Sequence, residues 1–228
     1  MKPSSVLDLP SAAAATAAYL GVVVSVEDPD RLARVQVRLF SFDGIADQDA
    51  PAWARVAVPF AGGDRGAFLI PDVGDEVVVV FVNGDPRHPL VIGSLWNGNQ
   101  RPKESLGGDR VDRWTLVGKA GTRIAIVEES DPTISLTTPG GVSATLTDAS
   151  GGKIELSAAG STITIDSNGV SIQSASRISM QGTQITADAG TVTVNAGVST
   201  FSGMVRCDIL QTNTVISTTY TPGAGNIW

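Results

Sequence analysis

Residues whose chemistry suits catalysis or metal binding are few and far apart in this chain of 228 residues. Cys207 is the single cysteine, which excludes an intrachain disulfide framework. His88 is the single histidine, and its proline-rich surroundings, Asp85–Pro89, favour a turn residue. A histidine metal site would need three copies of His88 on a trimer axis. The sequence therefore predicts no bound metal and no cofactor.

The acidic residues of the second half stand singly. Only nine of the 77 residues from Ile124 to Thr200 are charged, whereas a glycosidase needs paired carboxylates in a cleft. The run Gly62–Gly66 lacks the Lys-Ser/Thr of a phosphate-binding loop, and no helical pattern follows it. No catalytic residue is expected, and the chain is predicted not to be an enzyme.

Net charge and the N-terminus limit the partners further. The net charge is −7 with no basic patch, which argues against nucleic acid. No apolar run of about 18 residues could span a membrane as a helix. Lys2 followed by Ala12–Ala18 faintly resembles a secretory signal, but Asp8 and Pro10 interrupt it. The alternative, an N-terminal arm over residues 1–18 that docks on a partner, is preferred.

Short apolar pairs recur from Thr122 to Thr200, mostly seven to ten residues apart, and Gly, Ser, Asn, Asp or Pro separates them. Within each pair the two residues are two positions apart, the period of a β-strand. The pairs are Ile124/Ile126, Ile134/Leu136, Ala144/Leu146, Ile154/Leu156, Ile163/Ile165, Val170/Ile172, Ile178/Met180 and Val192/Val194. This pattern predicts a ladder of short strands.

The spacing of the ladder also predicts its oligomeric state. About eight residues per pass provide one strand and one corner, too few for a coil that closes on itself. Three chains that each supply one wall could close a prism with the apolar pairs inside and no free sheet edges. We expect an intertwined homotrimeric β-helix whose core is formed by Ile154, Leu156, Ile163, Ile165, Val170, Ile172, Ile178, Met180, Val192 and Val194.

Residues 19–97 have the pattern of a compact all-β domain, most simply a small Greek-key barrel of the OB type. Asn83-Gly84-Asp85 is a strong hairpin signal. The aromatic residues that could stack on bases or sugars are better interpreted as core: Trp53, Phe60, Phe68 and Phe81. The expected strands are 19–27, 32–40, 53–58, 68–70, 76–82 and 90–95.

The same region resembles the OB domain of contractile-tail spikes, the family of phage baseplate assembly protein V and the VgrG proteins of type VI secretion. The most specific motif is Pro71-Asp72-Val73-Gly74-Asp75-Glu76-Val77, followed by Gly84-Asp85-Pro86 and Gly93-Ser94-Leu95. The ladder after it is similar in type to the trimeric β-helical needle of that family. The resemblance implies five parts: an arm (1–18), an OB collar (19–97), a linker (98–121), a needle (122–200) and a tip (201–228).

This resemblance implies a structural central spike that joins hub and tail-tube or baseplate proteins to a membrane-puncturing needle. The linker is too short for an inserted lysozyme domain, and the hub is expected to be a separate protein. The chain lacks the His-x-His pair that binds iron at the apex of some relatives, so the tip could carry a separate PAAR-type cap. Trp228 would then plug the trimer end or anchor that cap.

Assembly is expected in the cytoplasm, into a phage tail-like particle that acts at the envelope of a target cell and transiently contacts its membrane. Whether that particle is extracellular is left open. Two alternatives stay open at this point: a trimeric adhesin or receptor-binding fibre, and a β-helical polysaccharide-acting enzyme.

Overall fold

The computed structural model describes residues 17–44 and 50–219 of the chain. The chain divides after Ala175 into two units. Strands dominate the described residues of the first unit, which also include three short 3-10 turns: η2 (Phe40–Phe42), η3 (Val82–Gly84) and η4 (Ala149–Gly151). The strands form a closed barrel, a two-stranded hairpin and a seven-stranded sheet.

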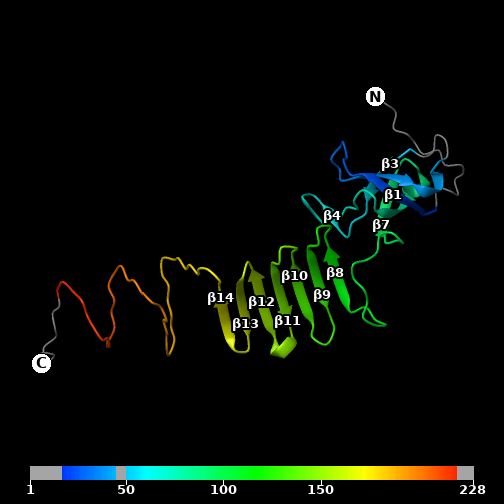
Figure 1. Cartoon of the computed structure of the whole chain (residues 1–228). Coiled ribbons are helices and arrows are strands. Elements are labelled where there is room, and N and C mark those ends of the chain that lie inside the picture. Colours follow the sequence, from blue (N-terminus) through cyan, green and yellow to red (C-terminus); the bar gives the residue numbers. More distant parts are fainter. Residues whose placement is uncertain (1–16, 45–49, 220–228) are drawn as a thin grey trace. The chain divides into compact units, whose positions relative to one another are not determined.

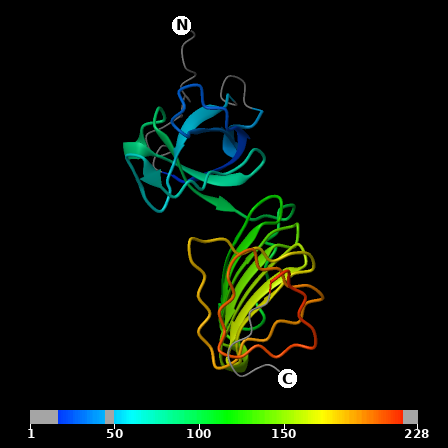
Figure 2. The ribbon, with the colours of Figure 1, turned by 90° about the vertical axis from the view of Figure 1, so that its left-hand side faces the viewer.

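The barrel has five strands in the order β1-β2-β3-β7-β6, and β6 pairs again with β1 (Figures 1 and 2). Neighbours are antiparallel except β3 and β7, which run parallel with Arg55 opposite Leu90. This closure leaves the barrel without a free edge. The strand bounds are β1 (Tyr19–Ser25), β2 (Val35–Leu39), β3 (Ala52–Val56), β6 (Glu76–Phe81) and β7 (Pro89–Leu95).

Alternating β-branched residues build the barrel core. In β2 and β6 every second residue is buried, including Val35, Val77 and Val79, which are completely inaccessible. Such side chains suit a pleated, half-buried surface. Within this core, Tyr19 contacts the rings of Phe42 and Phe81, each with a centroid distance of 5.6 Å.

Gly21 lets two barrel strands approach closely. A Cβ atom on Gly21 would lie 2.7 Å from the backbone oxygen of Arg38 on the paired strand β2. No side chain fits at that separation without moving backbone. Glycine is therefore required at this point of the β1–β2 ladder.

A carboxylate holds the loop between β1 and β2. The Asp28 side chain accepts hydrogen bonds from the backbone amides of Leu32 and Arg34 and from the Arg34 guanidinium, whose Nη2 lies 2.6 Å away. The guanidinium also lies over the Trp53 ring, 5.7 Å from its centroid. Hydrogen bonds from Arg34 hold the pKa of the Asp28 carboxyl well below its usual range, although burial opposes the shift.

The seven-stranded sheet is a simple antiparallel meander, in which each strand pairs with the next along the chain (Figure 1). Its strands have five or six residues and are joined by short turns. They are β8 (Arg113–Val117), β9 (Arg123–Val127), β10 (Thr133–Thr137), β11 (Ser143–Thr147), β12 (Lys153–Ala158), β13 (Ser161–Asp166) and β14 (Gly169–Gln173).

The second unit begins at Ser176, and its described residues, 176–219, contain no helix or strand. Every one of them is exposed. The apolar side chains of this segment include Ile178, Met180, Val192 and Val194, with 54% to 73% of their surface accessible. The strands predicted around these two pairs are therefore absent from residues 176–219, which form no backbone ladder among themselves.

Three further expectations differ from the structure. Phe60 and Phe68 are 61% and 79% exposed rather than core, because they flank the small hairpin of β4 (Ala61–Gly62) and β5 (Arg65–Gly66) outside the barrel sheet. That hairpin replaces the strand expected at 68–70. The segment interpreted as linker, 98–121, contains β8, so the sheet begins earlier than the ladder predicted.

Candidate functional site

One face of the seven-stranded sheet carries two straight columns of apolar side chains. Cross-strand partners place apolar residues directly opposite one another at every step, for example Ile134 opposite both Ile126 and Leu146. The first column is Trp114, Ile126, Ile134, Leu146, Ile154, Ile165 and Val170, and the second is Leu116, Ile124, Leu136, Ala144, Leu156, Ile163 and Ile172. We call these fourteen residues the apolar face.

Within the first unit, no described residue covers the apolar face. Its thirteen large side chains are all 38% to 68% exposed, from Ile154 to Val170. Single exposed apolar residues are ordinary, but contiguous patches of this kind mark interaction surfaces. The barrel core, by contrast, holds Val23 at 1% and Val91 at 1%.

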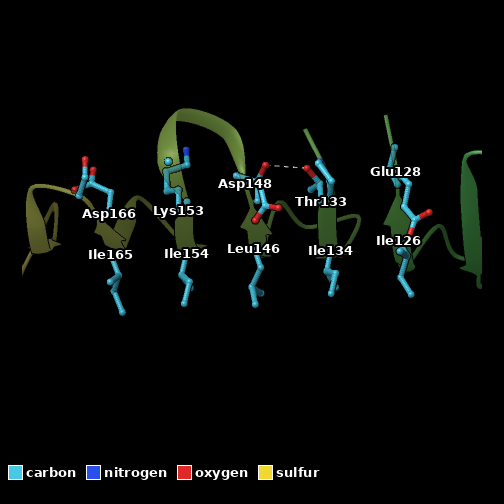
Figure 3. A pocket seen from close by; sticks show the side chains of 16 residues that line it. Ile126, Glu128, Thr133, Ile134, Leu146, Asp148, Lys153, Ile154, Ile165 and Asp166 are labelled. Carbon is cyan, nitrogen blue, oxygen red and sulfur yellow. Dashed lines mark hydrogen bonds between the residues drawn. The ribbon is translucent and has the colours of Figure 1, made fainter. Parts of the chain in front are cut away.

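Figure 3 shows five members of the first column, Ile126, Ile134, Leu146, Ile154 and Ile165, projecting to the same side of the sheet. Thr133, Lys153 and Asp166 point to the other side. A groove runs along this column, and its rim includes Glu128 and Asp148 at the ends of β9 and β11. The side chains of both acids have no ion pair or hydrogen bond among the described residues.

The opposite face of the sheet is polar and partly covered by the preceding segment of the chain. Glu104 bridges the two arginines that begin β8 and β9: its oxygens lie 3.8 Å from Arg113 Nη1 and 2.6 Å from Arg123 Nε. Between them, Ala125 is completely buried. The hydrogen bond from Arg123 lowers the pKa of Glu104, which keeps the bridge charged.

A second set of contacts holds the same end of the sheet. Arg113 Nε donates to Asp112 at 2.8 Å, and its Nη2 pairs with Glu129 in the turn after β9. The backbone amide of Glu128 donates to the Asp112 backbone oxygen at 2.7 Å. These contacts hold neighbouring segments of the same chain against the polar face of the sheet. None of them involves a side chain of the apolar face.

The structure brings six of the ten predicted trimer-core residues onto the apolar face: Ile154, Leu156, Ile163, Ile165, Val170 and Ile172. Ile178, Met180, Val192 and Val194 lie in the strandless segment instead. The predicted tip residue Trp228 lies outside the described residues. Sequence reasoning missed Trp114 and Leu116 as the start of the two columns, although they show the same two-residue spacing.

Within the described residues there is no group of three potential His, Cys, Asp or Glu metal ligands. The described part of the chain also contains no helix long and apolar enough to cross a membrane.

Two family models match the chain in sequence order. Residues 19–96 match the injector OB domain of type VI secretion systems and phage baseplates, which confirms the predicted OB-fold for the barrel. Residues 133–199 match the C-terminal trimerisation domain of phage baseplate protein V. That second match includes β10 to β14 and the first part of the strandless segment.

Curated relatives are spike proteins. The chain is 43% identical over 74 residues to the type VI secretion system spike protein VgrG5 of Pseudomonas aeruginosa, which covers 32% of this chain and 9% of the relative. It is 39% identical over 79 residues to the spike protein VgrG3 of Vibrio cholerae, covering 34% of this chain and 8% of the relative. The chain thus matches only about a tenth of the length of these relatives. With both domain models matched in order, the chain belongs to the contractile-tail spike family of phage baseplate protein V and the VgrG proteins.

Proposed function

We propose that this chain is a structural, non-catalytic central spike of a contractile injection system and that it acts as a homotrimer. The observation that carries the proposal is the uncovered apolar face of the β8–β14 sheet. One chain provides one wall with two apolar columns, and three such walls would enclose all six columns around a common axis. The match to a trimerisation domain over residues 133–199 supports this stoichiometry.

The energetics favour closure. Each large side chain of the apolar face has about half of its surface still exposed, and full burial of such a side chain is worth roughly 1.5–3 kcal/mol. Completing the burial would therefore contribute about 1 kcal/mol per residue. Thirteen residues in each of three chains sum to about 40 kcal/mol, which exceeds the roughly 4–15 kcal/mol that each of the two association steps costs.

The strandless segment 176–219 would complete the needle in the same trimer. Its apolar residues keep recurring, at Ile178, Ile185, Val192 and Val198, at intervals of six or seven residues. In the sheet, successive strands begin ten residues apart from β9 to β12 and eight residues apart from β12 to β14, so the repeat shortens along the chain. The shorter repeat leaves no room for a strand and a wide turn within one chain, so this segment would pair with strands of the other two chains.

In the assembled particle, the barrel would join hub and tail-tube proteins, and the needle would face the target envelope. The spike contributes stiffness and shape, while contraction of the sheath would supply the force. A PAAR-type cap could sit on the needle tip. These partners follow from the family of the chain and not from contacts in the structure.

Gel filtration with multi-angle light scattering tests the assembly. We expect a mass of about three times the 23.5 kDa chain. In the producing bacterium, a strain that lacks this chain should regain contractile particles in electron micrographs when the wild-type chain is supplied. The Ile154→Asp variant should not restore them, whereas Glu155→Gln, on the polar face next to it, should. A monomeric wild-type chain would refute the proposal.

A further inference from the structure

The two margins of the seven-stranded sheet differ sharply in charge. Turns alternate between the margins, because the sheet is a meander. One margin, which we call the acidic margin, consists of residues 128–132, 148–152 and 166–168. Its turns carry Glu128, Glu129, Asp131 and Asp148, and Asp166 ends β13 beside them. The basic residues at this edge, Arg113 and Lys153, are the first residues of β8 and β12, and Arg113 pairs with Glu129.

The other margin, the glycine-rich margin, consists of residues 118–122, 138–142 and 159–160. Five of its twelve residues are glycine, and Lys119 is its only charged residue. At Gly140 an added Cβ atom would meet nothing within 4 Å, and the Gly140 amide donates no hydrogen bond within the described residues. Val142, which is 47% exposed, continues the alternation of β11 onto the apolar face.

The groove beside the first apolar column lies along the acidic margin. Its floor is the row Ile126, Ile134, Leu146, Ile154 and Ile165, and its rim includes the carboxylates Glu128 and Asp148, which are unpaired among the described residues (Figure 3). An occupant that fits this groove must offer an apolar side chain to the floor and hydrogen-bond donors to the rim. It must also carry no negative charge.

The glycine-rich margin of a second copy has these properties. In a cyclic trimer with all apolar faces inward, symmetry requires that one margin of each wall meets the other margin of the next wall. An arrangement that placed two acidic margins together would oppose ten carboxylates. We infer that the groove of one subunit receives the 138–142 turn of the next subunit, with Val142 on the apolar floor and the Gly140 amide facing Glu128 and Asp148. This inference rests on the proposed trimer.

Disulfide trapping tests this arrangement in the full chain with Cys207→Ser as background. The paired variant is Gly140→Cys with Asp148→Cys, and Ala159→Cys with Asp148→Cys probes the neighbouring turn. Both turns lie across the sheet from Asp148, separated from it by a strand of five residues (β11) or six residues (β12), about 17–20 Å, so no intrachain disulfide can form. The matched controls are the three single-cysteine variants.

After oxidation with copper phenanthroline, we expect at least one paired variant to run mainly as a covalent trimer on non-reducing gels, and the single variants to run as uncrosslinked chains. Dimers from the Asp148→Cys single variant would show acidic margins in contact and overturn the inference. So would unlinked chains in both paired variants whose light scattering still shows trimers. A monomeric mass before oxidation would instead refute the proposed function, and the inference with it.

Discussion

The barrel and the seven-stranded sheet differ in whether one chain can bury their apolar side chains. The barrel closes on itself and hides its core within one chain, with Val35, Val77 and Val79 completely buried. The sheet has an equally regular pattern but leaves thirteen large side chains exposed on one face. The same alternation of apolar and polar residues thus produces a self-sufficient domain in one region and one wall of an assembly in the other.

The largest expected effect comes from a charge on the apolar face. Ile165→Asp would place three carboxylates near the trimer axis, and each buried ion costs several kcal/mol. We expect the trimer to dissociate in light scattering while the barrel stays folded. Thr164→Asp, on the opposite face of the same strand, is the control and should remain trimeric. An Ile165→Asp protein that runs as an SDS-resistant trimer would contradict the proposed needle core.

A cavity in the barrel core should lower the stability of the barrel without affecting the trimer. Val77→Ala removes two buried methyl groups from a completely inaccessible site, which should cost about 2 kcal/mol of barrel stability. Calorimetry of the full chain should show a lower Tm for a transition that does not depend on protein concentration. The mass by light scattering should stay that of the wild type. Loss of the trimer in this variant would show that the two regions are not independent.

Gly21→Ala tests the close approach of β1 and β2. The added methyl would lie 2.7 Å from the Arg38 oxygen, and we expect a loss of about 1–2 kcal/mol from forced backbone shifts. Gly93→Ala in β7 is the matched control, because an added methyl group there would meet nothing within 4 Å. Equal Tm values for the two variants would argue against a steric requirement at Gly21.

Acid should weaken the barrel modestly through Asp28. Its pKa is lowered in the folded state, so its stabilising effect is complete above the unfolded pKa of about 4 and is lost as the pH falls below that value. The Tm of the barrel transition should therefore fall less steeply between pH 5 and pH 2 in Asp28→Asn than in the wild type. Asp64→Asn, which removes an exposed loop carboxylate and leaves the Asp28–Arg34 contacts intact, is the matched charge control.

Much of this architecture follows from local patterns. The barrel strands around Val35–Leu39 and Glu76–Phe81 were predictable, because their two-residue alternation matches the buried face of a sheet. The apolar columns were predictable for the same reason. Phe60 and Phe68 were not, since an aromatic residue beside a short hairpin has the same local pattern as one in a core strand.

The predictions that failed in the second half of the chain did so for a different reason. Ile178 and Val192 show strand spacing, but a strand also needs a neighbour, and sequence alone does not say which chain supplies it. The charged residues before Trp114 and Leu116 dominate that segment and give it the pattern of a linker. The charge difference between the two margins becomes visible only once the meander places alternate turns on the same side.

Because the sheet is a meander, its length along the direction in which the strands stack can change in steps. Strands stack about 4.8 Å apart, so seven of them span about 29 Å. Insertion or deletion of two successive strands, roughly twenty residues, would change this span by about 10 Å and return the chain to the same margin with both columns aligned. Evolution or design could therefore change the length of such a needle by whole hairpins. A single added strand would instead place the following segment at the opposite margin of the sheet.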